Sequence, residues 1–290
     1  MTLAVIPYPA IDPVAVNIGP FPIRWYALAY IGGLAFGWLY ARLLVRSDRL
    51  WGQTISGPQL RPAGDTIDDL VLYTALAIVI GGRLGQVLFY EWPYYAAHPI
   101  EIFQLWNGGM SFHGGLIAAA IAIWYVARHA KVPILTLADI CAAATPIGIL
   151  LGRIANFIRP EEWGRPADVT LVPWAMVFPG VDDLPRHPSQ LYEAGLEGIA
   201  LFIVLAFFVR GGALKRPGLT TGIFLVGYGL ARIFCEFFRD LDPQPAQLVS
   251  WLTMGMLLSV PMIVAGVGLI VYAMRRGAGE GVAEVEARPN

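Results

Sequence analysis

Charged residues are scarce in this 290-residue chain: only 14 % of its residues are Asp, Glu, Lys or Arg, whereas 57 % are hydrophobic. Soluble domains carry about 25 % charged residues, and a soluble protein of this size needs that charge to cover its surface. The apolar residues here fall in long runs, and a helix needs about 20 such residues to cross a bilayer. The scarcity of charge therefore excludes a soluble protein and indicates a membrane protein.

Other absences exclude further classes of protein. The formal net charge is −1, so no basic field indicates nucleic-acid binding. Cys141 and Cys235 are the two cysteines, and both fall in apolar runs, where we expect them to pack and not to form a disulfide. The four histidines belong to no His, Asp or Glu group at ligand spacing, so we expect neither a metal nor another cofactor. No basic region with a small-residue cleavage site precedes the first apolar run, which predicts a retained span.

The apolar runs predict seven transmembrane helices and an all-α, polytopic fold. They cover about residues 23–45, 67–90, 112–130, 136–158, 194–210, 219–238 and 248–274. The fifth run is short and begins with Glu193 and Glu197, so its start is the least defined. Residues 1–275 are expected to form one transmembrane domain, and 276–290 a polar, disordered cytoplasmic tail.

Lysine and arginine residues set the orientation of the helices, because they collect in cytoplasmic loops. The loops on one side hold Arg46, Arg49, Arg61, Arg128, Lys131, Arg210, Lys215, Arg216, Arg275, Arg276 and Arg288, and those on the other hold Arg24, Arg159, Arg165, Arg186 and Arg239. Eleven against five places the N-terminus outside and the C-terminus in the cytoplasm. The outer segment 159–193 is long and rich in Pro, Trp and charge, which predicts an ordered extracytoplasmic cap.

This orientation gathers the polar residues of four spans near the outer leaflet, although each charge at the membrane centre costs at least about 2.5–3.5 kcal/mol. They are Arg83, His113, Arg153, Asn156, Tyr228, Arg232, Glu236 and Arg239. Arg153 and Arg232 would repel each other unless an anion lay between them. Glu236 is one candidate for that anion, and a lipid phosphate is the other, since arginine binds phosphate with two parallel donors. Arg83 alone fits a structural ion pair or snorkelling equally well.

A motif at the end of the fourth predicted helix carries a resemblance to a known family. Residues 152–164 resemble the signature Gly-Arg-x-Gly-Asn-Phe-x-Asn-x-Glu-x-x-Gly of the phosphatidylglycerol–prolipoprotein diacylglyceryl transferase family. Gly152, Arg153, Asn156, Phe157, Glu161 and Gly164 match it, whereas Ala155 and Arg159 depart from it. Further stretches resemble the family's motifs in order, at 24–26, 82–85, 106–115, 187–193 and 228–239. The resemblance covers about residues 20–270.

The resemblance implies both a reaction and a location. The diacylglyceryl group of phosphatidylglycerol would move to the thiol of a lipobox cysteine in a prolipoprotein, forming a thioether and releasing glycerol phosphate. The enzyme would lie in the bacterial inner membrane, in contact with membrane lipids, with its site near the periplasmic leaflet. Its partners would be these lipids and the prolipoprotein signal peptide, and no nucleic acid.

The resemblance also suggests roles for individual residues. The thiolate is the nucleophile, and His113 is the candidate base, with helix capping as the alternative. Arg153 and Arg232 are expected to stabilise the charge of the leaving phosphate. The residues expected to bind or orient substrate are Tyr26, Arg83, Asn156, Glu161, Gly164, Tyr228, Glu236 and Arg239, with structural hydrogen bonding as the alternative. His187 and Gln190 are expected to shape the path of the peptide.

Three rival interpretations fit the sequence less well. A transporter for an anionic solute would use buried arginines along a pathway, so it predicts charges spread through the membrane depth, or inverted repeats. The charges instead collect at one depth, and no repeat is visible. A rhomboid-like protease needs a Gly-x-Ser-Gly nucleophile motif, which the sequence lacks. A structural scaffold would have no need to pair Arg153 with Arg232.

Overall fold

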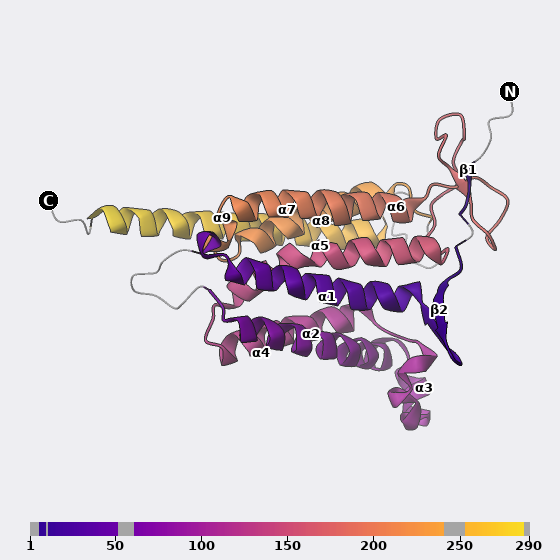
Figure 1. The fold of residues 1–290 in the computed structure, drawn as a ribbon, viewed down its shortest axis with the longest axis horizontal. Helices are drawn as coiled ribbons and strands as arrows, with labels where there is room; N and C mark the ends of the chain where they lie inside the picture. The colour runs from indigo at the N-terminus through magenta and orange to yellow at the C-terminus, as the bar shows by residue number, and fades with distance from the viewer. Residues whose placement is uncertain (1–5, 10, 52–60, 241–252, 287–290) are drawn as a thin grey trace.

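Long apolar helices run side by side through most of the computed structural model (Figure 1). The structure describes residues 6–9, 11–51, 61–240 and 253–286. The α-helices are α1 (Trp25–Arg46), α2 (Gly64–Gly85), α3 (Trp92–Ala97), α4 (Phe112–His129), α5 (Ile134–Ile158), α6 (Ser189–Glu193), α7 (Leu201–Arg210), α8 (Leu219–Glu236) and α9 (Met254–Glu286). Two π-helical segments, η2 (Gln86–Tyr90) and η5 (Ala194–Ala200), extend α2 and join α6 to α7. Short 3-10 turns are η1 (Asp48–Leu50), η3 (Pro99–Phe103), η4 (Leu105–Asn107) and η6 (Ala213–Lys215).

The predicted all-α membrane fold is confirmed. Each of the seven predicted spans has a helical counterpart, and six helices of the described chain are long and apolar enough to cross a membrane. The seventh counterpart is α4, which is not among those six; its 18 residues include His113, Arg128 and His129. The first five residues of the last predicted span, 248–252, lie outside the described residues. Helix α9 continues to Glu286, so the tail expected to be disordered is helical up to that residue.

One predicted boundary is wrong by several residues. The fifth span begins at Ser189 and not at residue 194, because α6, η5 and α7 form one continuous helix from Ser189 to Arg210. Glu193 and Glu197 are therefore inside the helix, and both are fully buried. The predicted cap segment accordingly ends at Pro188.

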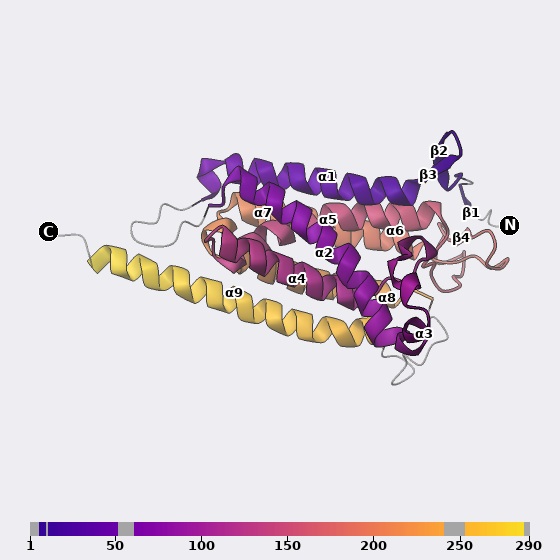
Figure 2. The same cartoon turned by 90° about the horizontal axis from the view of Figure 1, so that it is seen from below.

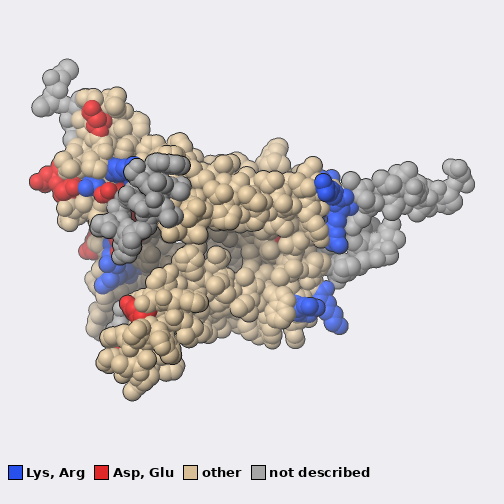
Figure 3. Space-filling model, turned by 180° about the vertical axis from the view of Figure 1, so that it is seen from behind, with Lys and Arg blue, Asp and Glu red and all other residues tan. Residues whose placement is uncertain are grey.

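The two ends of the bundle differ in charge. The N-terminal strands lie at one end, and the end of α9 lies at the other, in both views of the ribbon (Figures 1 and 2). On the face drawn in Figure 3, Lys and Arg alone colour the end toward the C-terminus, whereas acidic and basic side chains mix at the end toward the N-terminus. The surface between them is almost free of charge, as a lipid-facing surface must be.

Glycine allows the backbones of α2 and α4 to touch. A Cβ atom at Gly114 would lie only 2.7 Å from Cα of Gly85, and one at Gly81 would lie 2.6 Å from the carbonyl oxygen of Gly114. Helices α8 and α9 meet in the same way at Gly222 and Gly266. Small residues permit this approach in a membrane, where the hydrophobic effect does not hold helices together. The pairs thus pack through backbone contact.

A hydrophobic core closes the end of the bundle opposite the N-terminal strands. Ile67 of α2, Leu137 of α5 and Val209 of α7 are buried within it, together with residues of α1 and α4. At the other end the chain is less regular. Strand β1 (Ile6–Pro7) pairs in parallel with β4 (Met176–Val177), and β2 (Val14–Ile18) pairs antiparallel with β3 (Phe21–Arg24). Arg83, Arg153 and Arg232 lie in the parts of their helices toward this second end.

Candidate active site

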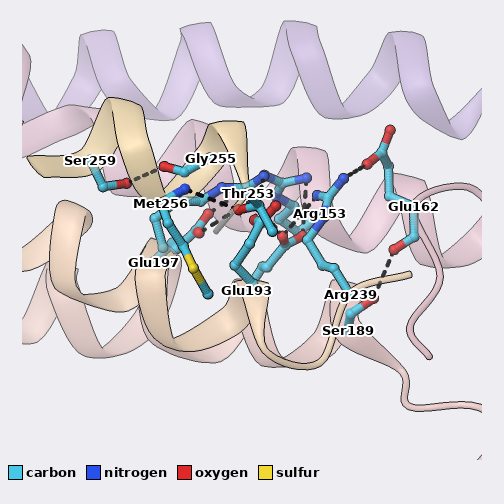
Figure 4. Close-up of polar contacts among 12 residues, drawn as sticks. Arg153, Glu162, Ser189, Glu193, Glu197, Arg239, Thr253, Gly255, Met256 and Ser259 are labelled. Carbon is cyan, nitrogen blue, oxygen red and sulfur yellow. Dashed lines mark hydrogen bonds and ion pairs between the residues drawn. The ribbon is translucent and has the colours of Figure 1, made fainter. Parts of the chain in front are cut away.

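A cluster of arginines and glutamates lies between α5, the α6–η5 segment and α8 (Figure 4). Helix α5 contributes Arg153 near its end, and α8 contributes Arg232 and Glu236. The α6–η5 segment contributes Glu193 and Glu197. Arg239 follows α8, and Glu162 follows α5 at the edge of the cluster. We call these seven residues the charge cluster.

Glu193 is the centre of the charge cluster. Its Oε2 lies 3.0 Å from Arg153 Nη1, and its Oε1 accepts hydrogen bonds from Arg232 Nη1 at 2.6 Å and Arg239 Nη1 at 3.0 Å. One fully buried carboxylate therefore joins three guanidinium groups from different elements. The predicted repulsion between Arg153 and Arg232 is relieved by an anion, but in the structure that anion is Glu193 and not Glu236. Glu236 pairs with Arg232 on its own helix, at 3.2 Å.

The carboxylates of the cluster keep Arg239 charged despite its burial. Burial alone would lower the pKa of Arg239, but Glu193 and Glu162 raise that pKa above its ordinary value. Ion pairs to buried carboxylates are strong only when charges and donors match, and removal of one partner is costly. Three arginines here face Glu193, Glu197 and Glu236, with Glu162 added at the edge. The arrangement is thus a buried network of ion pairs.

Glu193 and Glu197 were not among the predicted site residues. One sequence pattern could have indicated them: two carboxylates stand four residues apart in an apolar run, with no cation nearby in the chain. Such residues need partners from other helices. In the sequence they mark the start of the fifth span, because sequence alone does not show that α5 and the segment around α8 supply three cations.

The structure does not bring Arg83 to the charge cluster. Its guanidinium group donates to main-chain carbonyls of the segment after α3, including Ile102 at 2.8 Å and Gly108 at 2.7 Å. It also lies over the ring of Tyr95, with its Cζ 4.9 Å from the centroid. Arg83 is 4 % exposed. Its contacts favour the structural alternative over substrate binding.

His113 opens α4 and is exposed. Its Nδ1 lies 3.4 Å from the Tyr90 hydroxyl, and among the described residues no hydrogen bond or ion pair joins the histidine to the charge cluster. The alternative role as a helix cap is wrong, because Ser111 is the N-cap: its hydroxyl accepts a hydrogen bond from the Gly114 amide at 3.2 Å. The ring of His113 is therefore exposed and takes no part in the cap.

Tyr26, Asn156, Glu161 and Gln190 form a group near the charge cluster. The Tyr26 hydroxyl interacts with Asn156 and lies within electrostatic range of Glu161. The Glu161 amide donates to the Asn156 carbonyl at 3.1 Å, and Gln190 Nε2 donates to the Glu161 carbonyl at 2.6 Å. The sequence predicts that Tyr26, Asn156 and Glu161 act together with Glu236 on the headgroup, and it places Gln190 with His187 on the path of the peptide. Gln190 is fully buried, however, so it supports the loop and does not line a path for peptide.

Gly164 and His187 hold the cap against the end of α8. The Gly164 amide donates to the His187 carbonyl at 3.0 Å, and a Cβ atom at Gly164 would lie 2.6 Å from the Phe238 carbonyl oxygen. Only glycine fits there. The His187 ring packs on Phe238, and burial lowers the pKa of His187. Both residues thus shape the surface just beyond Arg239.

Tyr228 lies one turn before Arg232 on α8 and stands within electrostatic range of Glu197 and Arg232. It therefore faces the charge cluster as predicted.

Both cysteines are free, as expected. Across the residues that the structure describes, no group of three or more His, Cys, Asp or Glu side chains is arranged to hold a metal ion.

Comparison with known proteins gives one consistent result. Residues 13–272 match the family model described as prolipoprotein diacylglyceryl transferase. A protein of Methylocella silvestris named phosphatidylglycerol–prolipoprotein diacylglyceryl transferase is 59 % identical over 274 residues, which is 94 % of this chain and 98 % of the relative. Relatives with the same name from Rhodopseudomonas palustris (56 % identical, 96 % of each chain) and Nitrobacter hamburgensis (55 % identical, 98 % of this chain and 96 % of the relative) are also similar.

Proposed function

Because this chain belongs to the prolipoprotein diacylglyceryl transferase family and is a transferase of the membrane, we propose that it lipidates cysteine in prolipoproteins. The thiolate sulfur of a lipobox cysteine attacks the glyceryl carbon that carries the phosphate of phosphatidylglycerol. A carbon–sulfur bond forms, the bond from that carbon to the phosphate oxygen breaks, and glycerol phosphate leaves. The rival idea of an anion transporter gains no support from the relatives' names or from the single position of the charge cluster.

One observation carries this proposal: Arg153 and Arg232 converge on one carboxylate, at 3.0 and 2.6 Å. A position between two guanidinium groups that holds a carboxylate also suits a phosphate, because each anion offers two oxygens to the planar fork of donors of an arginine. The leaving phosphate gains charge as its ester bond breaks. Donors fixed in a poorly hydrated site stabilise such charge far more than water does.

Other residues complete the proposed site. Tyr26, Asn156 and Glu161 lie together and orient the glycerol headgroup. Tyr228, Glu236 and Arg239 position the phosphate-binding arginines. Gly164 and His187 form the wall past which the peptide reaches the site.

The decisive experiment is a single-turnover assay with purified enzyme in detergent. Phosphatidylglycerol with a labelled headgroup should release glycerol phosphate only after a lipobox peptide is added. A peptide with the cysteine replaced by serine is the matched control. Release that occurs equally with both peptides would indicate a phospholipase and would contradict the proposed transfer.

His113 is the proposed acceptor of the thiol proton, because it is exposed, free of capping and at the same end of the bundle. His113→Gln keeps a polar side chain but removes the base, so we expect a rate loss on the order of 10²–10⁴-fold. A variant that keeps near-normal turnover would assign the proton to another group.

We also propose that the enzyme lies in the bacterial inner membrane, with the charge cluster near the periplasmic leaflet. The excess of basic residues in the loops of the opposite end supports this orientation (Figure 3). A reporter fused after residue 280 should then report the cytoplasm, and one inserted within 170–180 the periplasm. The reverse result would place the site on the cytoplasmic side.

A further inference from the structure

Glu197 differs from every other carboxylate of the charge cluster. It is 0 % exposed, yet neither of its carboxylate oxygens accepts a hydrogen bond from the described residues. Its nearest cationic nitrogens are Arg153 Nη2 at 3.6 Å and Arg232 Nη1 at 3.8 Å. An ionised carboxylate buried without hydrogen bonds is costly, because it has lost its water shell and gained no donors.

The groups that face Glu197 explain why it has no donor of its own. Arg153 and Arg232 direct their shorter contacts to Glu193, and Arg239 binds Glu193 and Glu162. The remaining titratable groups around Glu197 are Glu193 on its own helix, and Tyr228 and Cys235 on α8. None of these three adds a positive charge. Glu197 is therefore the carboxylate that the cluster neutralises least.

A count of charges shows what a bound phosphate would do. Arg153, Arg232 and Arg239 contribute three positive charges, and Glu162, Glu193, Glu197 and Glu236 contribute four negative charges if all are ionised, so the cluster sums to −1. The phosphodiester of phosphatidylglycerol would bring the total to −2 within a buried site. Like charges at such distances disfavour the ionised form of the weakest-held carboxylate.

We infer that Glu197 is the proton-holding residue of the site. It takes up one proton from water when the phosphate binds Arg153 and Arg232, and it returns that proton when glycerol phosphate leaves. This inference rests on the proposed function. The proton uptake offsets the charge of the lipid.

The first test uses the unmodified enzyme and needs no turnover. Short-chain phosphatidylglycerol is titrated calorimetrically into the purified protein, without peptide, in two buffers with different enthalpies of ionisation. The difference in apparent binding enthalpy gives the number of protons exchanged, and we expect uptake of about one per lipid. Binding with the same enthalpy in both buffers overturns the inference. Phosphatidylcholine, whose headgroup has no net charge, is the matched control and should cause no uptake.

The second test assigns the proton to Glu197. In Glu197→Gln the side chain has the shape of the protonated acid and cannot ionise, so lipid binding should exchange no proton. The KM for phosphatidylglycerol should rise with pH in the unmodified enzyme and stay constant in the variant, whatever its absolute turnover. Proton uptake that persists in Glu197→Gln overturns the assignment. Glu197→Leu serves the same measurement if the glutamine variant does not accumulate.

Glu193→Gln is the charge-matched comparison, because Glu193 lies one turn away on the same face but already accepts from two arginines. With Glu193 neutral, the lipid-bound cluster carries −1 and Arg153 and Arg232 can pair with Glu197, so proton uptake on lipid binding should fall well below one per lipid. The experiments distinguish failure of the proposed role of Glu197 from failure of the proposed transferase activity. An enzyme that releases glycerol phosphate but exchanges no proton contradicts only the role of Glu197, whereas one that releases no glycerol phosphate contradicts the transferase itself.

Discussion

Arg83 and Arg153 both belong to apolar helices at the same end of the bundle, but their partners differ in kind. Arg83 donates to main-chain carbonyls, including those of Ile102 and Gly108. Arg153 pairs with the side-chain carboxylates of Glu193 and Glu197. Carbonyl groups are fixed by the course of the chain and cannot be protonated. Carboxylates can rotate, and they can be replaced by another anion.

This difference separates an arginine that holds a segment from one that serves a substrate. The carbonyls around Arg83 lie in the segment of 3-10 turns after α3, so Arg83 fixes the position of this segment against α2. The carboxylates around Arg153 occupy donors that a phosphate can claim. A buried arginine is therefore informative about function only once its acceptors are known.

We expect the largest loss of activity when an arginine of the charge cluster is replaced by lysine. Arg153→Lys and Arg232→Lys each keep a positive charge but lose the fork of donors, so the rate of transfer should fall on the order of 10²–10³-fold. The measurement is release of glycerol phosphate with a lipobox peptide. Arg42→Lys is the matched control, because Arg42 pairs with Asp68 at 2.8 Å at the other end of the bundle. Normal turnover of both cluster variants would show that only charge matters there.

A smaller and different effect is expected at Arg83. Arg83→Lys has too few donors for the surrounding carbonyls, and each buried acceptor left without a partner costs about 1–3 kcal/mol. The variant should unfold at a lower temperature in detergent, while the folded enzyme keeps its kcat. A lower kcat at unchanged thermal stability would place Arg83 among the substrate-binding residues and break the comparison.

The smallest effect is expected at Arg159, where the sequence departs from the family motif. Arg159 pairs with Glu161 at 3.0 Å, and their side chains are 53 % and 38 % exposed. An ion pair open to solvent contributes only about 0–1 kcal/mol. Arg159→Asn should therefore change stability by less than about 0.5 kcal/mol and leave turnover near normal. A large change in turnover would mean that Arg159 contacts substrate.

The sequence predicted the helices well because apolar runs and membrane thickness fix them. It also predicted that Arg153 and Arg232 would meet around an anion, since their helix ends lie at one depth. It did not predict Glu193 as that anion, because pairing across helices depends on how α5, α6 and α8 pack, which no local pattern records. For the same reason it did not predict that the donors of Arg83 turn away from the site.

The π-helical segment η5 has a consequence for the whole fifth span. Six residues spaced four apart, Ser189, Glu193, Glu197, Leu201, Leu205 and Val209, are all nearly or fully buried. In a straight α-helix, steps of four residues overshoot a turn by about 40°, so such a row would wind around the helix. The wider π turns of η5 rotate the row back by a similar amount at the two steps between Glu193 and Leu201. A single straight edge of this span can thus be polar at one end and apolar at the other, and one residue deleted from η5 would turn the two halves of that edge apart.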